Sequence, residues 1–226
     1  LLIMERIGII SPHCDDETLG CGGVISRFSD STEFKVVFVS EGTSCRYADP
    51  AAHIEEIEEN MQIRKSSALR ALGSVPASFY DLPCGRLDQV PQIIINKIIE
   101  QEIQDFRPDT VFTHWDSDAN TDHRKVHDAT IVATRPYSSL VETVLCYEVL
   151  SSTEWNFSKS FCPNAFYQLS ETDVKNKCLS MQEYHTECKE WPYPRSDEGI
   201  TTLAKMRGMQ AGFQFAEAFK VMRICI

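Results

Sequence analysis

The sequence predicts an α/β fold in which a mostly parallel, doubly wound sheet is covered by helices on both faces. Two observations support this prediction. Short apolar runs that are typical of buried strands alternate with longer stretches that are typical of helices. The 226 residues suffice for one α/β domain with a sizeable core, and no linker, repeat or low-complexity tract divides them. We therefore expect a single domain over residues 1–226.

The first part of the chain alternates regularly between the two element types. An apolar run at residues 5–11 predicts a strand, and residues 17–29 predict a helix whose first turn is loosened by glycines. Residues 34–40 predict a second, buried strand. Residues 53–72 predict a helix that begins acidic and ends basic, which suits the helix dipole, and Gly73 follows as a good stop signal.

The second part continues the same alternation. Residues 77–82 predict a short strand, and residues 89–105 predict an amphipathic helix with isoleucines at helical spacing. Residues 109–114 predict the next strand, which leads into a polar cluster and then a helix to about residue 133. The remaining predicted elements are strands at 141–150 and 165–169 and helices at 171–187 and 197–221.

The composition argues against several classes of function. The net charge of −11 and the lack of a basic stripe disfavour nucleic-acid binding. The apolar runs are too short to cross a membrane, and the apolar start ends at once at Glu5, so we expect no transmembrane segment and no signal peptide. Nine scattered cysteines without a CxxC pair favour reduced thiols in a cytoplasmic protein. A homo-oligomer is compatible with all of this.

Two polar clusters follow predicted strands. The run His-Cys-Asp-Asp-Glu at residues 13–17 lies between the first strand and its helix, and a second run at residues 118–127 follows the strand at 109–114. In open α/β sheets, ligands bind beyond the carboxyl ends of the strands. We therefore expect both clusters to meet at the same edge of the sheet.

These clusters can supply a metal site. A catalytic zinc needs three protein ligands and an open position for water, and His13, Asp16 and His123 meet that need. Asp15 is then left to take a proton from water, whose pKa zinc lowers to about 7. Asp122 is placed to hold a ligand from the second shell. Imidazole and carboxylate also suit other divalent ions, so Zn²⁺ is the first expectation among several.

The same stretches resemble the signature of the PIG-L/LmbE-like zinc deacetylases. Residues 12–23, with the pattern Pro-His-x-Asp-Asp-Glu-x-Leu-Gly-x-Gly-Gly, are similar to the first family motif, and Asp-x-Asn-x-Asp-His-Arg at 118–124 is similar to the second. Weaker similarity extends through Arg195-Ser196 to residues 216–219. The resemblance implies a Rossmann-like three-layer sandwich that hydrolyses an N-acetyl group, usually on an amino sugar such as N-acetylglucosamine.

By motif position, the resemblance makes His13, Asp16 and His123 the zinc ligands and Asp15 the general base. Asn120 departs from the pattern, because many members carry a histidine there that is credited with helping the oxyanion or the leaving amine. Asparagine donates a hydrogen bond but cannot transfer a proton. We keep Asn120 as a candidate catalytic and substrate-binding residue. Candidates for the missing acid are Asp15 acting twice and the histidines His114, His127 and His185.

Several polar residues have two interpretations. Arg46 and Arg195 lie on loops and can either bind the substrate or pair with an acid, and we predict substrate contact. His127 lies one helical turn after His123, and we favour an outer role around the metal over direct ligation. Taken alone, the adjacent aspartates at 15 and 16 could simply cap a helix, but the joint pattern disfavours that interpretation.

The predicted function is metal-dependent removal of the N-acetyl group from an N-acetylated amino sugar or its conjugate, within carbohydrate metabolism. The expected partner is therefore a small molecule. Two alternatives stay open at this point. One is hydrolysis of another N-acyl amide, on a natural product. The other is a non-catalytic sugar- or nucleotide-binding protein of Rossmann-like fold.

Overall fold

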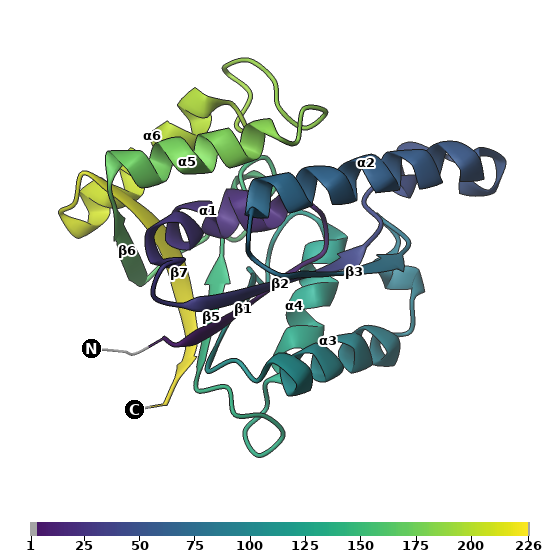
Figure 1. The fold of residues 1–226 in the computed structure, drawn as a ribbon, viewed down its shortest axis with the longest axis horizontal. Coiled ribbons are helices and arrows are strands. Elements are labelled where there is room, and N and C mark those ends of the chain that lie inside the picture. The colour runs from purple at the N-terminus through teal and green to yellow at the C-terminus, as the bar shows by residue number, and fades with distance from the viewer. Residues whose placement is uncertain (1–3, 226) are drawn as a thin grey trace.

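The computed structural model describes residues 4–225. Its centre is a seven-stranded sheet with the strand order β3-β2-β1-β4-β5-β7-β6 (Figure 1). The strands are β1 (Arg6–Ser11), β2 (Glu33–Ser40), β3 (Ala77–Leu82), β4 (Thr110–His114), β5 (Thr143–Tyr147), β6 (Ala165–Leu169) and β7 (Phe215–Ile224). The α-helices are α1 (Asp16–Phe28), α2 (Ile54–Leu72), α3 (Gln92–Phe106), α4 (Thr121–Ala133), α5 (Glu171–Gln182) and α6 (Asp197–Ala211).

The strands β3, β2, β1, β4 and β5 are parallel to one another, whereas β7 is antiparallel to both β5 and β6. From β1 the chain moves outward to β2 and β3 and then returns to β4 on the other side of β1. The strand order thus reverses between β1 and β4. At such a reversal the neighbouring connections lie on opposite faces, which leaves a crevice for a ligand. The prediction of a mostly parallel sheet is confirmed.

Helices cover both faces of the sheet: α3 and α4 lie on one face, and α1, α2, α5 and α6 on the other (Figure 1). Each face has its own apolar core. Ile9 packs into the core on the α1 side with Leu19, while its neighbour Ile10 packs into the other core with Ile99 and Val126. Successive side chains of a strand point to opposite faces, so β1 must be apolar throughout to serve both cores.

The predicted helix at 197–221 is wrong in its second half. Helix α6 ends at Ala211, and Gly212 follows with φ 77° and donates its backbone N–H to the carbonyls of Gly208 and Met209. Glycine adopts this left-handed conformation without a steric penalty, which makes it a common helix terminator. The chain then forms β7, whose first five residues are all buried between β5 and β6. Its buried part, Phe-Ala-Glu-Ala-Phe, contains two alanines and a glutamate, which favour helices and interrupt the continuous apolar run that marked the other buried strands.

Close packing at α1 fixes the position of the first polar cluster. A Cβ on Gly20 would lie only 2.2 Å from Cδ2 of Tyr147, so the helix approaches β5 more closely than any other residue would allow. Glu217 on β7 accepts hydrogen bonds from the backbone N–H of Gly23 at 2.8 Å and from Nζ of Lys177 at 2.6 Å. Helix α1 is therefore held to β5 and β7, and its N-terminus is held beside the strand ends.

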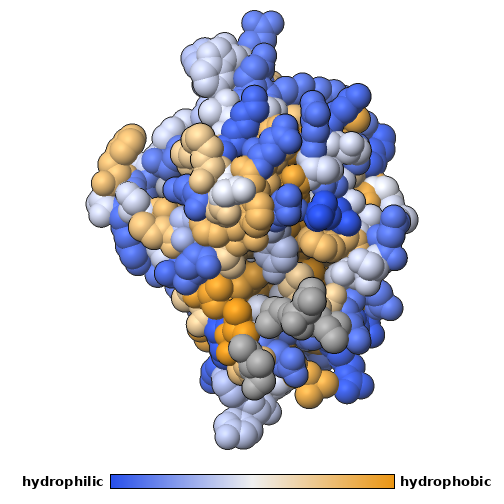
Figure 2. Space-filling model, turned by 90° about the vertical axis from the view of Figure 1, so that its left-hand side faces the viewer, coloured by the Kyte–Doolittle hydropathy of each residue, from blue (hydrophilic) through white to orange (hydrophobic). Residues whose placement is uncertain are grey.

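Figure 2 views the molecule from the side of β6 and α6. Hydrophobic residues gather in the middle of this face, and hydrophilic residues surround them. Helix α6 and strand β7 carry exposed apolar side chains, among them Met209 and Met222. Within residues 4–225, no helix has the length and hydrophobicity needed to span a membrane.

Candidate active site

The two polar clusters meet at the carboxyl ends of β1 and β4. The first occupies the turn from β1 into α1, and the second occupies the loop from β4 into the first turn of α4. His13, Asp16 and His123 place one potential ligand atom each within 4.8 Å of one another. Oδ2 of Asp16 lies 3.2 Å from Nδ1 of His13 and 3.4 Å from Nε2 of His123.

The donor set of this group fits a divalent cation. All three side chains are buried, and within the described residues Oδ1 of Asp16 is buried without a hydrogen-bond partner. Burial alone would raise the pKa of Asp16, but the nearby imidazoles of His123 and His114 hold it well below its usual range. A buried, ionised carboxylate oxygen with no partner is costly unless a cation binds it. Two imidazoles and one carboxylate are a common catalytic zinc set.

Two further carboxylates orient the imidazoles. Oδ2 of Asp122 lies 3.1 Å from Nε2 of His13, and it also accepts the backbone N–H of Gly85 at 2.6 Å. On the other side, Oδ1 of Asp118 lies 3.1 Å from Nδ1 of His123. Each histidine thus has one ring nitrogen facing Asp16 and the other facing a carboxylate, the arrangement that fixes tautomer and ring direction at metal sites.

Asp118 is a site residue that the sequence did not single out. Its carboxylate also accepts hydrogen bonds from the hydroxyls of Ser152 and Thr153, which come from the segment after β5. These donors and His123 outweigh the effect of burial, so the pKa of Asp118 lies well below its usual range. The only sequence signal was that Asp118 begins the second motif.

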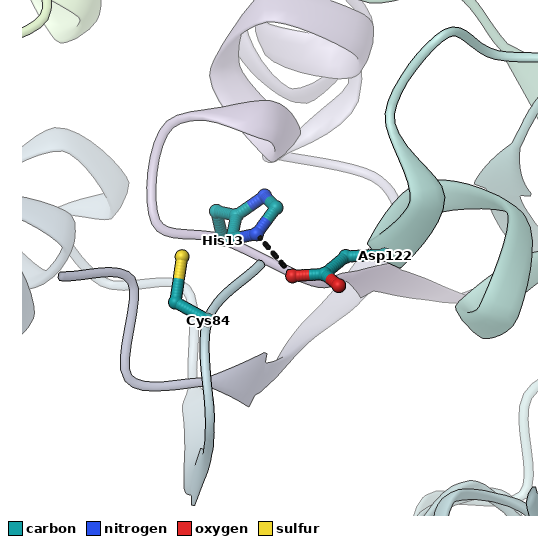
Figure 3. Close-up of side chains that lie close together, drawn as sticks. All are labelled: His13, Cys84 and Asp122. Carbon is teal, nitrogen blue, oxygen red and sulfur yellow. Dashed lines mark hydrogen bonds and ion pairs between the residues drawn. The ribbon is translucent and has the colours of Figure 1, made fainter. Parts of the chain in front are cut away.

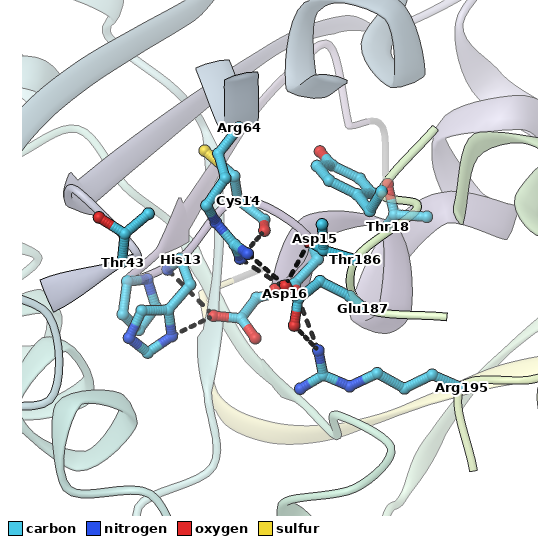
Figure 4. Close-up of polar contacts among 12 residues, drawn as sticks. His13, Cys14, Asp15, Asp16, Thr18, Thr43, Arg64, Thr186, Glu187 and Arg195 are labelled. Atoms are coloured by element: carbon cyan, nitrogen blue, oxygen red, sulfur yellow. Dashed lines mark hydrogen bonds and ion pairs between the residues drawn. The ribbon is translucent and has the colours of Figure 1, made fainter. Parts of the chain in front are cut away.

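Asp15 lies beside the metal group in an unusual backbone conformation, with φ 130° (Figure 4). Its Oδ2 accepts a hydrogen bond from Nη1 of Arg195 at 2.7 Å and lies 3.5 Å from Nη2 of Arg64. Burial raises the pKa of Asp15, and the positive charges of Arg195 and Arg64 oppose that rise. Positive φ in a non-glycine residue is strained and is typical of functional sites.

Arg64 reaches the site from α2, 7 % exposed, and donates to the carbonyl of Cys14 at 2.8 Å. We expected no substrate-binding role for Arg64, because residues 53–72 lack the Arg-x-x-Glu pattern that the family resemblance would place near the middle of this helix. Glu187, also missed, joins Arg64 to Arg46, because its Oε1 lies 2.5 Å from each guanidinium. Figure 4 shows Glu187 beside Arg64. These contacts outweigh the effect of burial and lower the pKa of Glu187 to about 2.

The remaining predicted residues lie around one cavity of about 230 Å³. Asn120, Arg46 and Arg195 all line it, together with His13, Asp15 and His123. Both arginines already pair with acids, since Arg46 contacts Glu187 and Arg195 contacts Asp15. Substrate contact by these arginines stays a prediction.

Asn120 and His127 have defined structural roles. Oδ1 of Asn120 accepts the backbone N–H of Asp122 at 2.9 Å and so caps α4. Nδ1 of His127 lies 2.9 Å from the carbonyl of His114 and does not line the cavity described above. His127 therefore contacts the backbone at the end of β4, whereas Asp122 contacts His13 of the metal group directly.

Comparison with known proteins places these features in a family. The family model described as PIG-L, GlcNAc-PI de-N-acetylase, matches residues 9–134, more than half of the chain. The matched region contains both polar clusters. No curated protein matches the sequence.

Solved structures share the fold over nearly the whole chain. The N,N'-diacetylchitobiose deacetylase of Pyrococcus horikoshii has a TM-score of 0.75 at 17% identity, over 97% of this chain and 84% of its own. The zinc-inhibited form of teicoplanin deacetylase has a TM-score of 0.74 at 17% identity, over 96% and 98%. The 4-carboxy-2-hydroxymuconate hydratase of Pseudomonas putida has a TM-score of 0.73 at 19% identity, over 99% and 98%.

Because these neighbours include both deacetylases and a hydratase, the shared fold does not by itself select a reaction. The sequence match is the stronger finding, since it covers the two motifs whose side chains form the buried metal group. On that match, the chain belongs to the PIG-L (GlcNAc-PI de-N-acetylase) family.

Proposed function

We propose that the protein is a metal-dependent deacetylase acting on an N-acetylated amino sugar or a conjugate of one. The observation that carries the proposal is that Asp15 lines the same cavity as His13 and His123 of the buried metal group. Family membership supports hydrolysis of an N-acetyl group. Deacetylases of chitobiose and teicoplanin among the structural neighbours support it further.

His13, Asp16 and His123 would hold the cation, and their donor atoms favour Zn²⁺, with another divalent ion as the alternative. When bound, such a cation polarises the amide carbonyl and lowers the pKa of water. Asp122 and Asp118 keep the two imidazoles turned toward Asp16, so the ligand atoms are preorganised before the cation arrives.

Asp15 acts as the general base that accepts a proton from the attacking water. Its Oδ2 is held by Arg195 and Arg64, and within the described residues its Oδ1 has no hydrogen-bond partner. Oδ2 therefore fixes the position of the carboxylate, and Oδ1 is available to take the proton. The two arginines also oppose the rise in the pKa of Asp15 that burial causes, which favours the ionised form that a base needs.

The amine that leaves must gain a proton, and neither His127 nor His185 lines the cavity where it would leave. Asn120 cannot transfer a proton, but its Nδ2 can donate a hydrogen bond to the developing oxyanion. His114 is fully buried, and burial together with His123 lowers its pKa to about 4, so it is neutral at pH 7. We therefore propose that Asp15 returns to the amine the proton it took from water.

The proposal also includes a single-domain organisation and a cytoplasmic location. Residues as far apart in the sequence as Asp15 and Arg195 meet in the site, and strands β1 to β7 form one sheet. Both observations support a single domain. All nine cysteines lie in the described residues and none forms a disulfide, which supports a reducing, cytoplasmic environment.

The test is acetate release from a panel of N-acetyl sugars, both free and conjugated, with metal content measured on the same sample. The panel also contains N-acyl amides of natural products, because a teicoplanin deacetylase shares the fold. The proposal expects release that requires bound metal and His123. Metal-dependent cleavage confined to the non-sugar amides would favour the natural-product alternative. A protein that binds sugars yet releases no acetate would overturn the proposal.

A further inference from the structure

A thiol lies on the opposite side of His13 from Asp16. Cys84 follows β3, and its Sγ, a ring nitrogen of His13 and a carboxylate oxygen of Asp122 all lie within 4.8 Å of one another (Figure 3). All three side chains are buried, with Cys84 only 4 % exposed. His13 therefore belongs to two groups of potential metal ligands: Nδ1 faces Asp16, whereas Nε2 faces Asp122.

A second thiol adjoins the first. Cys45 lies in the short helix η1 (Ser44–Arg46) after β2, in a loop that contacts the Cys84 loop through the hydroxyl of Ser44 and the carbonyl of Cys84. Gly85 makes the approach of these two loops possible, because a Cβ there would lie 2.7 Å from Cβ of Cys45. Cys45, Cys84 and His13 all line the 230 Å³ cavity, which gives a cation a route to this group.

The two thiol-bearing loops are rigidly held. Glu41 accepts the backbone N–H of Cys84 at 2.8 Å through Oε1 and that of Ser44 at 3.0 Å through Oε2. From the other side, Arg86 donates to the carbonyls of Ser44 at 3.1 Å and Tyr47 at 2.8 Å. The positions of both thiols are thus fixed by the backbone, as a preorganised ligand set requires.

We propose that this group is a second site for a thiophilic divalent cation such as Zn²⁺ or Cd²⁺. Its ligands are Nε2 of His13, a carboxylate oxygen of Asp122 and Sγ of Cys84. Three protein ligands, one of them a sulfur, suit a tetrahedral cation whose fourth position is open. Soft thiolates select zinc-like cations over magnesium or calcium.

A cation can bind at this second site only if its ligand atoms lose their protons. The Cys84 thiol releases its proton as its sulfur binds the cation. Nε2 of His13 must also be free of a proton, which can move to Nδ1, where Oδ2 of Asp16 lies 3.2 Å away. In that form Nδ1 no longer binds the first cation. Occupation of the second site therefore withdraws His13 from the first, and inhibition by excess zinc follows; this last step rests on the proposed deacetylase function.

The direct test is titration of the metal-free, reduced protein with Co²⁺, followed by near-ultraviolet absorption. We expect a sulfur-to-cobalt charge-transfer band in the native protein and in Cys162→Ser, a control at an exposed cysteine. Cys84→Ser should lose the band, whereas Cys45→Ser, which removes a neighbouring thiol outside the ligand group, should keep it. Bound Cd²⁺ should also protect Cys84, but not Cys162, from alkylation. An unchanged band in Cys84→Ser, or equal alkylation with and without Cd²⁺, would overturn the proposal.

A further variant separates this proposal from the proposed function. His123→Ala removes a ligand of the first group only, so the charge-transfer band should persist while acetate release is lost. If the native protein shows the band but no acetate release, the second site stands and the deacetylase proposal fails. If deacetylation is observed, half-inhibition by zinc should need at least tenfold more zinc in Cys84→Ser than in Cys162→Ser. Equal sensitivity of these two variants would overturn the competition for His13.

Discussion

Nη1 of Arg195 donates a hydrogen bond to Oδ2 of Asp15 at 2.7 Å, across 180 residues of sequence. Arg64 approaches the same oxygen at 3.5 Å from α2. The two cations hold one oxygen of a strained, buried carboxylate and oppose the rise in its pKa that burial causes. Several predictions about catalysis, metal binding and stability rest on this network and on the residues that surround it.

Asp15→Asn should abolish most of the catalytic rate and leave the metal in place. Loss of a positioned general base typically costs about 10²–10⁴-fold in rate. Asp15 is not a member of the three-residue metal group, so metal content per chain should match that of the native protein. Acetate-release kinetics and metal analysis on one sample check this. The control is Asp128→Asn, at an exposed position on α4; full activity in Asp15→Asn would show that another group is the base.

Arg195→Met should shift the acidic limb of the kcat/KM profile to higher pH. The positive charge of Arg195 lowers the pKa of Asp15, so removing that charge raises it, and a higher pH is then needed to ionise the base. Arg195→Lys keeps the charge and should keep the limb close to its native position. A pH–rate profile for both variants checks this, and a purely substrate-binding role would change KM in both without moving the limb.

Asp118→Asn and Asp122→Asn should each weaken metal affinity by about 10–100-fold, the usual effect of removing a carboxylate behind a ligating histidine. The amide can still hydrogen-bond the imidazole, but it no longer stabilises the ring by charge. Competition with a chelator measures the change. Asp116→Asn is the matched control, since Asp116 lies in the same loop and pairs with Lys159 at 3.0 Å instead; its affinity should equal that of the native protein.

Glu187→Gln should flatten the acid limb of the stability profile. The folded pKa of Glu187, about 2, lies below the ordinary value of 4.5, so its stabilisation is fully present above about pH 4.5 and is lost as pH falls through about 2. The contribution is on the order of 2–3 kcal/mol. Urea unfolding between pH 2 and pH 7 measures it.

The control for that experiment is Glu190→Gln, at an exposed position in the same loop. Its stability should follow the native pH dependence. A Glu187→Gln variant with the same pH slope as the native protein would show that the ion pairs with Arg46 and Arg64 do not stabilise the fold.

Gly20→Ala should destabilise the protein by about 2–3 kcal/mol, because its new methyl group overlaps the ring of Tyr147 in a closely packed core. Gly22→Ala is the matched control in the same helix. Its Cβ would lie 3.1 Å from Cγ of Lys177, so a far smaller shift of the neighbour would relieve the contact than at Gly20. Thermal unfolding of the pair checks this, and equal melting temperatures would contradict the packing argument.

Much of the fold and of the metal group could be predicted from the sequence because the signals are local. His13 and Asp16 lie three residues apart at a strand-to-helix turn, and His123 lies in a second short polar run after another strand. Parallel strands bring their carboxyl ends to one edge, so two local patterns sufficed to place the three side chains together. Strand β7 could not be predicted in this way, because two alanines and the buried Glu217 break its apolar run and favour a helix locally.

The sequence by itself determined the α/β class, the two clusters and the chemistry of their side chains, since each depends on neighbouring residues. Only the tertiary structure decided which charges surround Asp15, that Asp118 faces His123, and that Cys84 faces His13. These contacts join loops that follow different strands, and their geometry depends on how the sheet twists and how its helices pack. The electrostatics of the site therefore depend on long-range packing, which no local sequence pattern reveals.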